Sequence, residues 1–445
     1  MHTRLLTTAC SIALLSLCPL AATFVAKSSD AAPRPFDCAG ERCDSIARGF
    51  HAFADGRLPG LNGNGRSCAD CHMPDDSFQL APASVEARYQ ALQARREQHP
   101  DADDPLFRPI DADDFRTNGP AAGDFTTLRE HALVRIVFPL PPNLRLVDPE
   151  SNLVSNEASV DVWRMVPSVN NVALTGPGKV NPWPRGPNNF GGYQLDARVA
   201  TLEEQALGAL VNHAGITAAV PPRLLEDLSA FQRTLFSDAR VQALAEALNM
   251  PGGVLPDTDP PLDALEQAGK VVFQRACTQC HGGPEQTNAE LPIPHFQDIH
   301  TQCPRQVDTA SPPRFAFAPC SPSLARHART YEITLSTGAT MRRTSSDPGR
   351  ALLTGFVGGA APTDDWNKLD VPGLRGISRT APYFHNNSAA SLEDVVDHYI
   401  EFFKRVKANA APGSVPPVAT TDGVNFNRQP RPEERAALLA YLRKL

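Results

Sequence analysis

Two short motifs in this sequence combine two cysteines with a histidine at a spacing that suits covalent haem attachment. Each has the form C-x-x-C-H, and together they contain Cys68, Cys71 and His72, and Cys277, Cys280 and His281. In such a motif the two thiols bond the vinyl groups of a haem, and the adjacent histidine ligates the iron. The sequence therefore predicts two covalently bound c-type haems, with His72 and His281 as proximal ligands.

Two other uses of paired cysteines fit this sequence less well. A structural zinc site usually takes its four ligands from two neighbouring C-x-x-C pairs, whereas these pairs lie in different halves of the chain. A thioredoxin-like redox pair needs no following histidine and lies in a βαβ unit, a context that neither pair has. Two motifs of this kind in one chain therefore favour haem.

The first 26 residues resemble a secretory signal. Arg4 supplies a positive start, and an apolar stretch ending in small residues follows it. A membrane anchor is the alternative, but polar residues and Pro19 dilute this stretch. We therefore expect residues 1–26 to be cleaved, which would leave a periplasmic protein with no membrane span.

Four cysteines lie outside both motifs and outside the predicted signal. An oxidising compartment allows disulfides to form and persist. Because the members of each pair are close in sequence, we expect two disulfides, with free thiols as the alternative. The expected pairs are Cys38–Cys43 and Cys303–Cys320.

Composition narrows the class of protein. The 445 residues include 42 Lys and Arg against 49 Asp and Glu, so no basic excess suggests binding to nucleic acid. The 42 prolines are about twice the average share, which predicts long, turn-rich connections. Few segments alternate with period two. The predicted fold class is therefore mainly α with long loops.

The positions of the two motifs suggest two similar halves. We predict an N-terminal cytochrome c-like domain at residues 38–256 and a C-terminal one at 257–445, each with one covalently bound haem. The linker between them is placed at 257–261, and closing helices are expected at 224–235 and 432–445.

A helix is also predicted before each motif. In the first half the helical face is expected to carry Ile46, Phe50 and Phe53, with Asp44 as the N-cap. In the second half Asp259 is the expected N-cap and Pro260 the first helical residue. Its apolar face is expected to carry Leu262, Leu265, Gly269, Val272 and Ala276.

The segment from Ala94 to Pro149 is rich in proline and aspartate. A metal-binding loop is one interpretation, but no glycine-bearing calcium-loop spacing appears, so a solvated acidic surface is favoured. The aspartates concerned are Asp101, Asp103, Asp104, Asp111, Asp113 and Asp114.

Four stretches resemble the di-haem cytochrome c peroxidase family, which includes the MauG-type enzymes. Residues 371–377 (VPGLRGI) and 380–386 (TAPYFHN) resemble its loop near the second haem, and 164–171 and 196–206 resemble its signatures between the motifs. The resemblance spans roughly residues 44–445. It implies that peroxide meets the first haem and that the second, six-coordinate haem passes electrons.

The resemblance also implies a ligand for the second iron. Fourteen positions after His385 the peroxidases have a methionine, whereas this chain has Tyr399, as the MauG-type members do. A phenolate ligand favours ferric and higher-valent iron. Tyr399 lies on the apolar face of a helix that Ser391 and Asp394 are expected to cap, so a buried core tyrosine is the alternative.

The proton shuttle of the family is changed. The family pairs a glutamine with a glutamate ten residues later, and Gln205 matches the glutamine while Gly215 stands at the second position. His213 is the nearest candidate for acid–base work, with a surface histidine at a helix end as the alternative. Glu203 and Glu204 are interpreted as helix-start charges.

Three further family features are altered or open. The structural calcium is doubtful because Met165 replaces an asparagine ligand, although Thr380 and Pro382 still offer carbonyls. The family's tryptophan before Asp-Gly-Arg is Leu195 here, and Trp183 is the nearest indole. His385 is expected to bond near a haem propionate or the haem interface, with loop packing as the alternative.

These observations predict a periplasmic di-haem cytochrome that acts as a peroxide-dependent oxidoreductase. Its expected partners are hydrogen peroxide and a small redox protein (a cytochrome c or a cupredoxin), or a partner protein whose side chains are oxidised. The changes at Gly215 and Leu195 leave a different class open. In that alternative the chain is a non-catalytic electron-transfer cytochrome or a redox sensor.

Overall fold

The computed structural model describes most of the chain after the predicted signal. The described residues are 37–38, 40–108, 111–112, 125–175, 192–250, 254–283, 286, 296–303, 320–358, 364–409 and 430–445. The predicted signal and Trp183 lie outside the described residues, as do Asp113 and Asp114.

The first half is built around a close crossing of two helices, α3 (Cys43–Ala54) and α8 (Pro222–Arg233). A Cβ atom at Gly49 would lie 1.9 Å from the carbonyl oxygen of Asp227, so only glycine allows this approach. One turn later the ring of Phe53 packs on Phe231, with 5.3 Å between ring centroids. The crossing thus selects Gly49 and Phe53 as the buried face of α3.

This packing corrects two predictions for α3. Phe50 was expected in the core, but its side chain is 52% exposed because the face through Gly49 meets α8. Arg42, not Asp44, occupies the N-cap position. Asp44 lies in the first turn and pairs with Arg48 at 2.9 Å.

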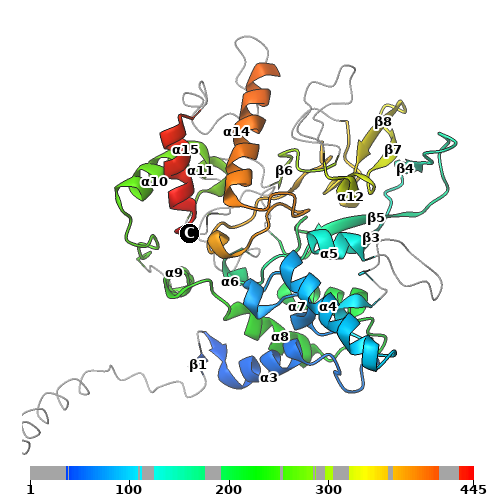
Figure 1. Cartoon of the computed structure of the whole chain (residues 1–445), viewed down its shortest axis with the longest axis horizontal. Helices are drawn as coiled ribbons and strands as arrows, with labels where there is room; N and C mark the ends of the chain where they lie inside the picture. The colour runs from blue at the N-terminus through cyan, green and yellow to red at the C-terminus, as the bar shows by residue number, and fades with distance from the viewer. Residues whose placement is uncertain are drawn as a thin grey trace, which may run out of the picture.

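The second half repeats the same crossing with α10 (Ala264–Ala276) and α15 (Pro432–Leu442). A Cβ atom at Gly269 would lie 1.9 Å from the carbonyl oxygen of Ala437. The ring of Phe273 packs on Tyr441 with 5.3 Å between centroids. Figure 1 shows the two helix pairs in separate parts of the molecule, α3 with α8 and α10 with α15.

The start and the face of α10 differ from the prediction. Asp263 caps this helix by accepting a hydrogen bond from the Glu266 N–H at 2.8 Å, so Asp259 and Pro260 lie before it. Leu265 is 50% exposed, because the close approach at Gly269 turns the adjacent face toward α15. The two closing helices, α8 and α15, occupy the predicted segments.

Strands are more numerous than the sequence suggested. Strands β3 (Leu133–Pro139) and β5 (Ser159–Met165) form an antiparallel pair. A second sheet has the order β4-β7-β8, with bounds Leu144–Val147, Arg329–Thr334 and Thr340–Ser345. Because β4 precedes residue 257 and β7 follows it, the two halves of the sequence share this sheet (Figure 1).

Shorter elements complete the described structure. They include the strand pairs β1 (Asp37–Cys38) with β2 (Glu41–Arg42) and β6 (Phe296–Gln297) with β9 (Leu369–Asp370). The remaining helices are α4 (Pro82–Gln98), α5 (Thr126–His131), α6 (Val172–Thr175), α7 (Leu202–Asn212), α9 (Ala239–Asn249), α11 (Thr278–His281), α12 (Pro322–Ala325), α13 (Ala351–Thr354), α14 (Leu392–Asn409) and the 3-10 turns η1 (Cys68–Asp70), η2 (Pro74–Asp76), η3 (Pro105–Phe107) and η4 (Ile377–Arg379).

The expectation of a solvated acidic surface in segment 94–149 is wrong for two aspartates. Asp104 is buried and pairs with Arg88, and Asp111 is buried and pairs with Arg66. Neighbouring apolar residues of this segment, including Leu106 and Phe107, join a core with α4. Each of these buried carboxylates has a guanidinium partner, whose charge offsets the cost of removing the carboxylate from water.

Both predicted disulfides are present. Cys38 bonds Cys43, and Cys303 bonds Cys320. Among the described helices, none combines the length and the apolar character needed to span a bilayer.

Candidate functional site

A cavity of about 540 Å³ lies between the two halves, and both C-x-x-C-H motifs line it. Around this cavity the structure brings together the residues that the sequence suggested for haem attachment, iron ligation, the haem interface and proton transfer. They are Cys68, Cys71, His72, Gln205, His213, Cys277, Cys280, His281, His385 and Tyr399.

Each motif adopts a helical turn that brings its three functional side chains to one side. In η1 the His72 N–H donates to the carbonyl oxygen of Cys68 at 2.8 Å. In α11 the His281 N–H donates to the carbonyl oxygen of Cys277, also at 2.8 Å. Residues i, i+3 and i+4 of a helical turn are neighbours, so two thiols and an imidazole face the cavity together.

The two motif histidines are held in the same tautomer. Nδ1 of His72 lies 3.1 Å from the carbonyl oxygen of Phe78, and Nδ1 of His281 lies 3.1 Å from that of Pro372. Because a carbonyl only accepts, Nδ1 must carry a proton in both rings, and in the neutral ring Nε2 then has the lone pair. Burial also lowers the pKa of His72 to about 4, so this ring is neutral. This is the arrangement that metal-ligating histidines use.

The four motif cysteines are free thiols in this structure. Burial raises the pKa of Cys68, Cys71 and Cys277 to about 12 and that of Cys280 to about 11. Such thiols are not the reactive thiolates of a disulfide oxidoreductase. Unpaired thiols, an imidazole whose Nδ1 faces a backbone carbonyl at each motif and a large cavity fit a c-type haem at both places.

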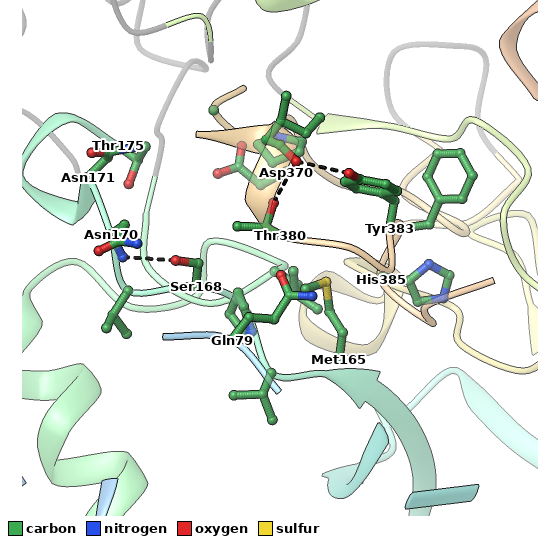
Figure 2. Close-up of a pocket in the computed structure, with 18 of the residues that line it drawn as sticks. Gln79, Met165, Ser168, Asn170, Asn171, Thr175, Asp370, Thr380, Tyr383 and His385 are labelled. Atoms are coloured by element: carbon green, nitrogen blue, oxygen red, sulfur yellow. Dashed lines mark hydrogen bonds between the residues drawn. The ribbon is translucent and has the colours of Figure 1, made fainter. Parts of the chain in front are cut away.

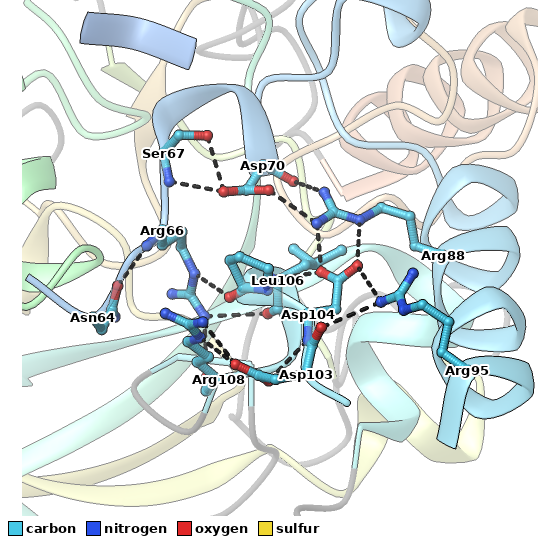
Figure 3. A network of polar contacts seen from close by, with 11 residues as sticks. Asn64, Arg66, Ser67, Asp70, Arg88, Arg95, Asp103, Asp104, Leu106 and Arg108 are labelled. Carbon is cyan, nitrogen blue, oxygen red and sulfur yellow. Dashed lines mark hydrogen bonds and ion pairs between the residues drawn. The ribbon is translucent and has the colours of Figure 1, made fainter. Parts of the chain in front are cut away.

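A polar network holds the first motif in place (Figure 3). Ser67 and Asp70 form a capping box on η1, and Arg88 donates to both the carbonyl and the carboxylate of Asp70. Arg88 also pairs with Asp104. Arg66 donates to four carbonyl oxygens, those of Pro105, Leu106, Arg108 and His213. The segment after α4 thus holds the first motif in position, a role that was not predicted from its sequence.

Gln205 lies on α7 and His213 is the residue that follows this helix. Both line the cavity, and α7 packs in the same core as Cys68 of the first motif. Thr201 caps the helix by accepting from the Glu204 N–H at 3.1 Å, and Glu203 pairs with Arg233 at 3.1 Å, so both glutamates serve the helix start as predicted. Gly215 follows the helix with a φ of 61°, in the left-handed region that favours glycine. The backbone at this position therefore favours glycine over a residue with a side chain.

His213 is joined to a buried ion pair. Its Nδ1 donates to Oδ2 of Asp111 at 2.6 Å, and Oδ1 of Asp111 pairs with Arg66. Burial alone would raise the pKa of Asp111, but the hydrogen bond from His213 and the charge of Arg66 lower it. Asp111 is therefore an anion that holds His213 by Nδ1 and leaves its Nε2 to serve the cavity. The sequence placed Asp111 on a solvated acidic surface and not at the site, because nothing in its own segment points to residue 213.

The second-motif end of the cavity contains Tyr399 on α14. Ser391 and Asp394 cap this helix as predicted, with the Asp394 N–H donating to Oγ of Ser391 at 3.2 Å. Phe384 and Phe403 flank the tyrosine ring. Burial raises the pKa of Tyr399. Within the part of the chain that the structure describes, its hydroxyl makes no hydrogen bond, which leaves its oxygen available to a ligand in the cavity.

Four segments that line the cavity are joined by hydrogen bonds, and Figure 2 shows three of their residues, Gln79, Met165 and His385. Nδ1 of His385 lies 3.1 Å from Oγ1 of Thr301, and the His385 carbonyl accepts from the Met165 N–H at 2.7 Å. The side-chain amide of Gln79 donates to the carbonyl oxygen of Pro382 at 3.1 Å. Among the described residues, the cavity lining includes no tryptophan.

A buried charge cluster lies nearby. Arg164 pairs with both Asp196 and Asp347, and all three side chains are buried. Asp196 also pairs with Arg198 at 2.7 Å. The cluster ties the strand β5 to segments on either side of residue 257.

Comparison with solved structures finds similar chains. One is a MauG-like protein associated with microbial copper homeostasis, with 18% identity and a TM-score of 0.43, covering 93% of this chain and 91% of that chain. Another is the diheme peroxidase BthA from Burkholderia thailandensis, with 17% identity and a TM-score of 0.40, covering 90% of this chain and 86% of that chain. A third is the hydrazine synthase of Kuenenia stuttgartiensis, with 15% identity and a TM-score of 0.32, covering 82% of this chain and 93% of that chain.

No protein-family model and no curated protein matches this chain. At such identities and TM-scores, the roles of individual residues rest on the contacts of this chain alone.

Proposed function

We propose that this protein is a periplasmic di-haem c-type oxidoreductase that uses hydrogen peroxide to oxidise another protein. The observation that carries the proposal is that both haem motifs line one cavity. Gln205 and His213 also line it, and Asp111 holds His213 by a hydrogen bond. The two disulfides and the signal-like residues 1–26 support an oxidising, exported location.

The residues assigned to hold the two cofactors follow from the motifs. Cys68 and Cys71 would tether the first haem and His72 would ligate its iron. Cys277, Cys280 and His281 would do the same for the second, with Tyr399 as its other ligand. When bound, the haems supply the redox chemistry that protein side chains lack.

His213 is assigned the proton transfer. Reduction of hydrogen peroxide to water requires one of its oxygens to lose a proton and the other oxygen, which leaves as water, to gain it. With Nδ1–H bonded to Asp111, Nε2 of His213 accepts that proton and returns it to the departing oxygen. The amide of Gln205, eight positions earlier on the same cavity wall, would orient the peroxide by hydrogen bonding.

The electrons come from outside the cavity. The proposed donors are a small redox protein, such as a cytochrome c or a cupredoxin, or side chains of a partner protein. His385, buried between the two halves, is assigned a hydrogen bond at the haem interface.

One observation favours a second candidate function. Gly215 stands where the related peroxidases have a glutamate, and its φ of 61° fits glycine. If His213 does not replace that glutamate, the chain is a non-catalytic electron-transfer cytochrome or a redox sensor.

The two candidates are separated by a variant of His213. We expect His213→Gln to lower the rate of the peroxide-induced change in the Soret band about 100-fold, because one proton-transfer group is lost. The matched control is His51→Gln, at an exposed histidine of α3 that does not line the cavity. Equal peroxide rates in both variants and the wild type would contradict the role of His213.

A further inference from the structure

We infer that the joint between the two halves closes without calcium, and that the side-chain amide of Gln79 makes the contact a metal would otherwise make. The family resemblance leads one to expect a calcium ion here, bound by an asparagine side chain and by the carbonyls at Thr380 and Pro382. Two of these three positions do not fit that ion.

The first misfit is at Pro382. Its carbonyl oxygen accepts a hydrogen bond from Nε2 of Gln79 at 3.1 Å, and Gln79 is only 2% exposed. The amide N–H presents a partial positive charge to this oxygen, as a cation would, and occupies the space beside it. A calcium ion at the same oxygen would bring its charge beside this buried N–H donor, whose partial positive charge opposes it.

The second misfit is at Met165. Calcium takes six to eight oxygen ligands, whereas a thioether is a soft ligand that suits other metals. In place of a side-chain ligand, the Met165 backbone N–H donates to the carbonyl oxygen of His385 at 2.7 Å. In the described residues, no group of three or more histidines, cysteines, aspartates or glutamates is placed to hold a metal.

The Gln79 contact links the first motif to the second half directly. Gln79 follows Phe78, whose carbonyl accepts from Nδ1 of His72 at 3.1 Å. The carbonyl of Ser77 accepts from Oγ of Ser168 at 2.6 Å. Segment 77–79 therefore contacts the proximal histidine, the segment after β5 and the loop that contains Pro382. A hydrogen bond here holds the joint with protein atoms alone.

The first test is calcium dependence of the haem-loaded protein, read by metal content and by thermal unfolding. After dialysis against calcium and removal of the excess, we expect far less than one calcium ion per chain. Neither EDTA nor added calcium should shift the Tm. Stoichiometric calcium, or a fall in Tm with EDTA, would overturn the inference.

The second test replaces the donor. Gln79→Met keeps the length of the side chain but leaves the Pro382 carbonyl buried without its partner, so we expect the Tm to fall by about 2–5 °C, equally with and without calcium. Gln90→Met is the matched control, because Gln90 is exposed and bonds only to Glu86 on its own helix. A wild-type Tm for Gln79→Met would also overturn the inference. Neither test measures peroxide turnover, so both outcomes are independent of the proposed function.

Discussion

Asp111 accepts a hydrogen bond from Nδ1 of His213 at 2.6 Å, although 102 positions separate the two residues. The contact joins a segment that resembles a solvated loop in sequence to the end of the helix that bears Gln205. It gives His213 a fixed orientation and an anionic neighbour, which a histidine at a helix end lacks on its own. The resemblance seen in the sequence implies a glutamate ten residues after Gln205, where this chain has Gly215, and we propose that Asp111 and His213 together take its role.

The lowered pKa of Asp111 gives this contact a testable pH dependence. In the unfolded chain an aspartate has a pKa of about 3.9. Because folding lowers the pKa of Asp111, its anionic form stabilises the fold fully above that pH. This stabilisation is lost as the pH falls toward the lower pKa of Asp111 in the folded protein. We expect the Tm difference between the wild type and Asp111→Asn to be constant from about pH 5 to 7 and to shrink below about pH 4. A difference that grew on acidification would contradict the ion pair with Arg66.

Tyr399 provides a test of the second iron site. If its oxygen ligates that iron, Tyr399→Phe should convert one of the two haems from low spin to high spin in the absorption and EPR spectra. Tyr89→Phe is the control, because Tyr89 packs on Phe107 and does not line the cavity. An unchanged low-spin spectrum in Tyr399→Phe would refute ligation and leave Tyr399 as a core residue.

The repeated helix crossing predicts which glycines are essential. In Gly49→Ala or Gly269→Ala the new Cβ would lie 1.9 Å from a backbone carbonyl oxygen. We therefore expect overpacking to lower the free energy of unfolding by about 1–3 kcal/mol or more. Gly208→Ala, in α7, is the control. The nearest atom there is 4.0 Å away, and alanine should be neutral or stabilise by about 0.5–1 kcal/mol. Chemical denaturation measures all three, and tolerance of alanine at both crossing positions would exclude the close approach.

The buried cluster around Arg164 predicts a larger effect. Arg164→Met leaves Asp196 without one of its two arginine partners and removes the partner of Asp347, which should cost about 3–5 kcal/mol of stability. Arg342→Met removes an exposed arginine that pairs with Glu332 at 3.2 Å, and we expect a change below about 1 kcal/mol. Similar Tm values for the two variants would show that the cluster does not stabilise the fold.

Some of this structure was predictable because its signals are local. The haem motifs are contiguous, the disulfide partners are close in sequence, and α14 follows a capping box at Ser391 and Asp394. Features set by distant partners were not predictable. The buried face of α10 depends on its contact with Ala437. Strand β4, in the first half of the sequence, pairs with β7, in the second half. Asp111 is buried only because Arg66 and His213 meet it there.

The central claim is that the chain binds two haems, one of which reacts with hydrogen peroxide. Rapid mixing of the purified protein with peroxide, followed by absorption spectroscopy, tests it most directly, with the haem content measured on the same sample. We predict two covalently bound haems per chain and a rapid change in the Soret band of one of them. Two haems that are both six-coordinate and do not react with peroxide would contradict the enzymatic account and favour an electron-transfer cytochrome.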